Sequence, residues 1–116
     1  MRQYKGVKAA IFHPGALQAI REFPPEAKRA TGEAILKLQY GAILGLPLSR
    51  PMPTVAIGVA ELRVKDREGT YRTFYYARHE RGILVMHAFT KKTQATPARE
   101  ISLARRRLKE LLDEEN

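Results

Sequence analysis

The fold depends most on residues 59–89, which read VAELRVKDREGTYRTFYYARHERGILVMHAF. Apolar and polar side chains alternate over residues 59–66 and again over residues 70–78, as in strands with one buried face. Residues 83–89 are nearly all apolar, which is typical of a central strand buried on both faces. The connections between these segments are short and each contains glycine, so the sequence predicts an antiparallel meander of three strands.

The segments before the meander alternate between strand, helix and loop patterns. Residues 5–13 are apolar and β-branched enough to predict an N-terminal strand. Residues 16–23 predict a short helix. A pair of prolines then breaks that pattern and opens a second helix over residues 24–44, because proline is tolerated in a first helical turn. Residues 45–55 contain three prolines and predict a loop.

A third helix follows the meander. Thr96 is suited to cap its N-terminus, and Pro97 is suited to its first turn. The helix is predicted to run to about Leu112 with one apolar stripe: Ile101, Ala104, Leu108 and Leu111. The resulting order is an N-terminal strand, a helix hairpin, a three-strand meander and a C-terminal helix. This order predicts a single α+β domain over residues 1–116.

The composition is that of one ordinary soluble domain. Of the 116 residues, 44% are hydrophobic and 28% are charged, which excludes a disordered chain. The absence of cysteine excludes disulfide scaffolds, thiolate zinc sites and cysteine nucleophiles. No apolar run approaches the ~20 residues that span a bilayer, and the N-terminus has no signal-type apolar stretch. We therefore expect a cytoplasmic protein with no membrane partner.

The charge balance points to an anionic partner. Lysine and arginine together number 21 against 12 acidic residues, giving a formal net charge of +9. An excess of this size favours binding to a polyanion such as nucleic acid, including ribosomal RNA. Two alternatives stay open, namely a merely basic soluble surface and a surface that pairs with an acidic protein.

The sequence contains no familiar catalytic motif. The three histidines are scattered, and neither a metal-ligand set, a glycine-rich phosphate loop nor a Ser-His-Asp set is evident. We therefore expect no metal and no cofactor. If the protein is an enzyme, lysine and arginine must do the chemistry, and these side chains suit phosphate groups.

Five cations belong to the meander and its end. Arg63 and Lys65 are two residues apart and so emerge on one face of their strand. Arg72 lies on the next strand, and Lys91 and Lys92 follow the third. These side chains could converge on one patch of the sheet, or they could simply be solvated residues on its outer face.

Histidine and tyrosine side chains in the meander allow two readings. His87 has a side chain suited to acid–base work, but its apolar neighbours favour a buried, hydrogen-bonded histidine. Tyr71, Tyr75 and Tyr76 alternate with core positions, which favours packing over stacking on a nucleic-acid base.

The sequence from residue 61 to residue 108 resembles a known family. It contains an ELR strand, a YRTFYY strand, the run HAFTKKT, and a helix that opens with TPAREISLARRR. This combination is similar to the RelE/ParE-superfamily toxins of bacterial type II toxin–antitoxin systems, in particular the HigB and phage-derived branch. The resemblance implies a compact fold like that of the microbial ribonucleases.

The resemblance also implies an activity and its residues. A toxin of this kind is an endoribonuclease that cleaves mRNA on the translating ribosome unless a cognate antitoxin, here expected to be a helix-turn-helix protein, binds it. The implied catalytic residues are Lys65, Arg72 and Lys92. The implied RNA-binding or phosphate-binding residues are Arg63, Lys91, Thr93 and Gln94.

Metal-free RNA cleavage requires a base, an acid and cations that stabilise charge on phosphorus. Lys65 stands between two arginines in the predicted sheet, and like charges lower the pKa of a lysine, so Lys65 is the candidate base. Arg72 is the candidate phosphate clamp because its guanidinium offers paired donors. Lys92 or Lys91 would hold the phosphate or assist the leaving group.

One departure from the family keeps other functions open. Many relatives carry a catalytic tyrosine near the C-terminus, whereas this chain has no tyrosine after Tyr76. The alternatives are a ParE-like inhibitor of DNA gyrase without nuclease activity and an inactive phage-derived remnant that binds nucleic acid.

Overall fold

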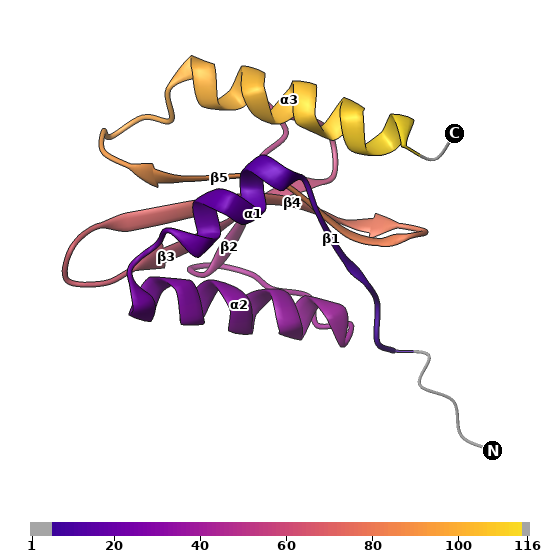
Figure 1. Ribbon diagram of the computed structural model, residues 1–116, viewed down its shortest axis with the longest axis horizontal. Helices are drawn as coiled ribbons and strands as arrows, with labels where there is room; N and C mark the ends of the chain where they lie inside the picture. The colour runs from indigo at the N-terminus through magenta and orange to yellow at the C-terminus, as the bar shows by residue number, and fades with distance from the viewer. Residues whose placement is uncertain (1–5, 115–116) are drawn as a thin grey trace.

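The computed structural model describes residues 6–114 and shows a sheet with helices on both faces (Figure 1). The strands are β1 (Ala10–Phe12), β2 (Ser49–Pro51), β3 (Val59–Lys65), β4 (Thr70–His79) and β5 (Gly82–Lys91). The helices are α1 (Pro14–Arg21), α2 (Pro25–Gln39) and α3 (Ala98–Asp113). Helices α1 and α2 pack on one face of the sheet and α3 packs on the other. The predicted α+β fold class is therefore confirmed. The predicted elements occur in the predicted order, with β2 as an additional strand.

The sheet has five strands in the order β1-β5-β4-β3-β2. Strands β3, β4 and β5 form the predicted antiparallel meander, while β1 pairs parallel with β5 and β2 pairs antiparallel with β3. The β4–β5 turn is tight, since His79 pairs with Gly82 across it. Gly82 has a φ of 141°, and a Cβ there would lie 2.3 Å from the carbonyl oxygen of Ala9. Only glycine fits this position.

Alternation along the strands gives the sheet two apolar faces. The face under α1 and α2 buries Leu62, Val64, Tyr71, Tyr75, Ile83 and Val85. The face under α3 buries Val59, Phe74, Leu84, Met86 and Phe89. Burying one large apolar side chain contributes about 1.5–3 kcal/mol, so both faces stabilise the domain.

The two N-terminal elements differ from their predicted positions. Residue 5 of the predicted strand lies outside the described residues, and of the remainder only β1 pairs with the sheet. Helix α1 begins two residues before Ala16 because the Nδ1 atom of His13 accepts the N–H of Gly15 at 3.1 Å. This bond satisfies one of the free N–H groups at the start of a helix.

Helix α2 is shorter than predicted. It ends at Gln39, whereas the apolar stripe predicted an end near Leu44. Gly41 adopts a φ of 94°, and its N–H donates to the carbonyl oxygen of Leu38 at 3.0 Å. A glycine with positive φ closes the helix, so the apolar residues that follow belong to a loop.

Strand β2 lies inside the segment predicted to be a loop. Its three residues have no periodic pattern of their own, and their pairing with β3 places Ser49 opposite Leu62. The hydroxyl groups of Ser49 and Tyr75 are 2.6 Å apart in the core and fix the strand further. Strand β2 forms because it pairs with β3, which is about ten residues further along the chain. A local sequence pattern cannot predict such pairing.

The C-terminal half matches the prediction closely. The three meander strands end within two residues of their predicted limits. Pro97, rather than Thr96, occupies the N-cap position of α3, and no side chain caps this helix. None of the helices within residues 6–114 is both long and apolar enough to cross a bilayer.

Candidate functional site

Cations from three neighbouring strands meet on the α3 side of the sheet. In the β3–β4 register, Arg63 lies opposite Arg72 and Lys65 lies opposite Thr70. Thr70 in turn lies opposite Lys91 of β5. Because directly opposed residues project from the same face, the sheet brings these four cations to one surface.

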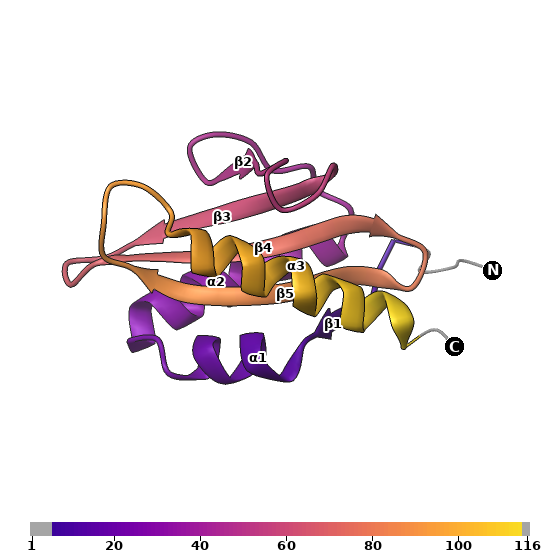
Figure 2. The ribbon, with the colours of Figure 1, turned by 90° about the horizontal axis from the view of Figure 1, so that it is seen from above.

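Helix α3 leaves this surface open. Figure 2 shows α3 running above β4 and β5, with β3 and β2 lying to one side of it. Lys65 is exposed and Arg63 is half-buried. Solvent and ligands can therefore reach the cations at the β3 side of the sheet.

A buried carboxylate lies beneath the arginines. Glu61 is 0% exposed, and its Oε1 atom accepts from Arg72 Nη1 at 3.1 Å and from Arg50 Nε at 2.9 Å. Arg50 reaches this position because β2 pairs it directly with Glu61. We call Arg50, Arg63, Lys65, Arg72 and Lys91 together the cationic face.

Sequence reasoning missed both Arg50 and Glu61. Arg50 was missed because β2 was not predicted, and its pairing is visible only in the folded sheet. A signal for Glu61 was present, since it stands two residues before Arg63 and therefore projects from the same strand face.

Several polar atoms at the centre of the face have no partner. Within residues 6–114, no hydrogen-bond partner is present for the buried Oε2 of Glu61 or for the buried Nε atoms of Arg63 and Arg72. An unsatisfied buried donor or acceptor costs about 1–3 kcal/mol. These atoms are therefore available to hydrogen-bond a ligand or a water molecule at the cationic face.

Two members of the cationic face have a lowered pKa. Burial lowers the pKa of Arg72, and the carboxylate of Glu61 opposes this change. Burial also lowers the pKa of Lys91, and the positive charge of Arg72 lowers it further. An arginine remains charged regardless, whereas a lysine whose pKa is lowered gives up its proton more readily.

Lys91 also fixes the segment that connects β5 to α3. Its Nζ atom donates to the carbonyl oxygen of Thr93 and, at 2.6 Å, to that of Gln94. The hydroxyl of Thr93 donates to the carbonyl oxygen of Ala95 at 2.6 Å. Thr93 and Gln94 thus contact the cationic face through their backbone oxygens, which accept hydrogen bonds from Lys91.

The two remaining predicted lysines lie at strand ends. Lys65 is the last residue of β3 and lines a groove together with Arg63 and Arg72. Lys92 is exposed and follows the end of β5. The register of β5 ends at Lys91, so the sheet does not bring Lys92 to the cationic face.

His87 is a buried, hydrogen-bonded residue, as its neighbours in the sequence indicate. It is 4% exposed, and its Nε2 lies 2.6 Å from Glu100 Oε1. Its Nδ1 lies 3.0 Å from Arg107 Nη1. Because arginine can only donate, Nδ1 accepts and Nε2 carries the proton toward Glu100. Burial lowers the pKa of His87, which favours this neutral form.

The tyrosines of the meander pack in the interior. Tyr71 and Tyr75 are each 4% exposed and belong to the core under α1 and α2. Tyr76 packs against the core under α3. Within the described residues, no three histidine, aspartate or glutamate side chains are grouped closely enough to hold a metal ion.

The fold and the cationic face define a small, basic α+β domain with an open surface suited to anions. The model of the family described as "Phage derived protein Gp49-like (DUF891)" matches residues 18–109, and the chain belongs to this family. The family is the HigB-like, phage-derived toxin branch, so the resemblance drawn from the sequence is confirmed.

The chain was also compared with individual curated proteins and solved structures. No curated protein matches the chain. The chain is similar to one in the crystal structure of the toxin–antitoxin complex RelBE2 from Mycobacterium tuberculosis, with 19% sequence identity and a TM-score of 0.49. The match covers 77% of this chain and 98% of that one.

Proposed function

We propose that the protein is a toxin that cleaves mRNA on the translating ribosome, in the cytoplasm and without a metal ion. A cognate antitoxin, a small helix-turn-helix protein, holds it inactive. The observation that carries this proposal is the cationic face, in which arginines and lysines from neighbouring strands surround one buried carboxylate on an uncovered part of the sheet. Family membership supports the toxin class.

The proposed reaction is attack of a ribose 2′-hydroxyl on the adjacent phosphorus. A new bond forms between the 2′-oxygen and phosphorus while the bond to the 5′-oxygen of the next nucleotide breaks. The products are a 2′,3′-cyclic phosphate and a free 5′-hydroxyl. One group must remove the proton of the 2′-hydroxyl, and another must supply a proton to the leaving oxygen.

Arg72 and Arg63 bind the phosphate and stabilise the charge that develops on it. Their direct pairing across β3 and β4 supports this role. Glu61 keeps the Arg72 guanidinium in position from beneath the sheet surface. Arg72 is therefore the main clamp, with Arg63 beside it.

Two lysines carry out the two proton transfers. Lys65, which lines the groove together with Arg63 and Arg72, acts as the base. Lys91 acts as the acid, because its lowered pKa favours release of a proton to the leaving oxygen. Lys92 binds the RNA just beyond the reacting phosphate, and the backbone at Thr93 and Gln94 forms the edge of the site. These assignments require no tyrosine near the C-terminus.

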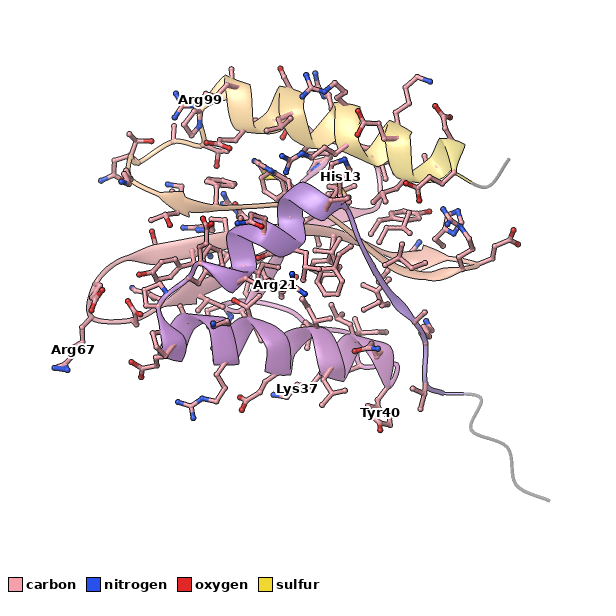
Figure 3. All side chains as sticks on the ribbon, in the orientation of Figure 1. His13, Arg21, Lys37, Tyr40, Arg67 and Arg99 are labelled. Carbon is pink, nitrogen blue, oxygen red and sulfur yellow. The ribbon has the colours of Figure 1, made fainter. Side chains whose placement is uncertain are left out.

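Cell-free translation tests this proposal. Primer extension on a defined mRNA should show breaks with the wild-type protein. Arg72→Lys retains the charge next to Glu61 but loses the two-point phosphate contact, so cleavage should fall roughly a hundredfold, as when one transition-state donor is removed. The matched control is Arg67→Ala, because Arg67 projects from the tip of the β3–β4 turn (Figure 3). Intact mRNA, together with impaired DNA supercoiling by gyrase, would overturn the proposal.

A further inference from the structure

A groove of about 360 Å³ opens beside the cationic face at the outer edge of β3. Its lining residues are Pro47, Leu48, Arg63, Val64, Lys65, Thr70 and Arg72. The volume is at the small end of the range of ~300–1,000 Å³ that ligand sites occupy. Three of the seven lining residues belong to the cationic face, so the groove and the proposed phosphate site are continuous.

The groove has one apolar wall and one cationic wall. Pro47 and Leu48 form the apolar wall, and Leu48 also packs against the core under α2. The wall is held in place because the carbonyl oxygen of Leu48 accepts from the N–H of Arg63 at 2.7 Å. A flat, apolar face such as that of a nucleobase is suited to the space between such a wall and a planar guanidinium.

The backbone of β3 adds hydrogen-bonding groups to the groove. The N–H of Arg63 points away from β4 toward Leu48. Because backbone direction repeats every two residues, the N–H and C=O of Lys65 point the same way. Strand β2 pairs with β3 only as far as Leu62, so β2 does not reach Lys65. This peptide edge can pair with the polar edge of a base.

A nucleobase fits these features better than a peptide strand does. Beyond the residues already paired, the free edge of β3 is one residue long, since the chain turns at Asp66, whose side chain accepts the N–H groups of Glu68 and Gly69. Addition of a peptide strand requires a longer edge. An acidic peptide could bind the cations but would make no apolar contact with Pro47 and Leu48.

We propose that this groove binds one base of the RNA next to the phosphate held by Arg72 and so sets the base preference of cleavage. This inference rests on the proposed function and names the part of the substrate that the groove recognises. Leu48 and Pro47 contact the base, and the backbone of Lys65 reads its edge.

Binding of small probes tests the groove without any cleavage. Ribose 5-phosphate and the four ribonucleoside 5′-monophosphates are titrated separately into the ¹⁵N-labelled protein. At least one nucleotide should bind about fivefold or more tightly than ribose 5-phosphate, the lower end of what contact with one base contributes. The amide signals of Leu48 and Lys65 should move with the nucleotide and stay in place with the sugar phosphate.

Leu48→Ala removes the larger side chain of the apolar wall and should weaken the preference for the nucleotide about fivefold while leaving ribose 5-phosphate binding unchanged. Leu36→Ala is the matched control, because Leu36 is an exposed leucine on α2. A thermal melt confirms that both variants are folded. Equal binding of nucleotides and ribose 5-phosphate to the wild-type protein would overturn the inference, as would stronger binding of a short polyglutamate peptide at the same amides.

Cleavage patterns separate this inference from the proposed function. On a defined mRNA, Leu48→Ala should change the ratio of breaks at sites that differ by one base by about fivefold or more. Unchanged ratios with full cleavage would refute the base groove and leave the nuclease proposal standing. Absence of cleavage by the wild-type protein would refute the nuclease proposal, and the probe titrations would still decide whether the groove takes a base.

Discussion

Glu61 is the residue on which the geometry of the cationic face depends. Its carboxylate is fully buried and bonded to two arginines, one from β2 and one from β4. A buried ion pair contributes little net stability when intact, but removal of one partner costs about 3–5 kcal/mol because the other charge is left uncompensated. The same carboxylate reduces the repulsion among the neighbouring cations.

Substitution of Glu61 measures that dependence. Glu61→Gln keeps the size of the side chain and removes the negative charge beneath Arg50 and Arg72. We expect the free energy of unfolding in urea to fall by about 3 kcal/mol, the low end for a broken buried pair. Glu33→Gln, on the exposed side of α2, should change it little. Equal stability of the two variants would show that the carboxylate does not hold the arginines.

His87 should make stability depend on pH. Its pKa is lowered in the folded protein, chiefly by burial, whereas the unfolded histidine has a pKa near ~6.5. The unfolded state therefore binds more protons as the pH falls below that value, and stability decreases between the unfolded and the folded pKa.

His87→Gln isolates this contribution. Urea unfolding of both proteins between pH 5 and pH 7.5 should show a steeper loss of stability toward low pH in the wild type. The difference in slope should reach up to about 1.4 kcal/mol per pH unit, the value for one proton. Identical slopes would mean that His87 titrates alike in the folded and unfolded states.

Among the elements, we expect α3 to contribute to stability more than to chemistry. Ala104, Leu108 and Leu111 of this helix are buried against the face of the sheet that also carries the cations. His87 joins the helix to β5 through Glu100 and Arg107. The helix thereby covers β5 and leaves the β3 side of the surface open.

Leu108→Ala separates the two roles. The lost side chain leaves a cavity under α3, and such substitutions cost about 2–5 kcal/mol. We expect a lower melting temperature and an unchanged cleavage rate per folded molecule. Leu112→Ala is the control, because Leu112 is 40% exposed. Normal stability with lost cleavage would place the chemistry on the helix instead of the sheet.

The elements also show how far the sequence could predict the fold. The meander was predictable because side-chain alternation is local and the turns at Gly69 and Gly82 punctuate it. The end of α2 and the existence of β2 were not. Apolar residues beyond Gly41 continue a helical pattern although the chain has left the helix, and β2 exists only through its pairing with β3.

The candidate site could likewise be predicted only where it depends on local sequence patterns. Convergence of Arg63, Lys65, Arg72 and Lys91 was one of two readings that the sequence left open, since only Arg63 and Lys65 share a face by their spacing alone. The register of β3, β4 and β5 brings all four to one surface. Arg50 could not be predicted to join them, because its strand was not visible in the sequence. The groove at the edge of β3 is formed in part by Pro47 and Leu48, just before β2. It could not be predicted from local sequence patterns either.

At the scale of the whole molecule, a net charge of +9 is arranged so that part of it lies on one open face. The helices account for this arrangement, since α1 and α2 cover one side of the sheet and α3 covers β5 on the other. A polyanion approaching the molecule gains from the overall charge. In the proposed function, the arginines around Glu61 then hold one phosphate of this polyanion in place.

The proposed attack by the 2′-hydroxyl is tested most directly by the chemistry at the cleavage position. A defined mRNA with a single 2′-deoxynucleotide at the main cleavage position is translated in a cell-free system with the wild-type protein. The account predicts that cleavage at this position disappears, and that the all-ribose mRNA yields a 5′ fragment ending in a 2′,3′-cyclic phosphate. Cleavage of the 2′-deoxy position at the normal rate would contradict attack by the 2′-hydroxyl and, with it, the roles assigned to Lys65, Arg72 and Lys91.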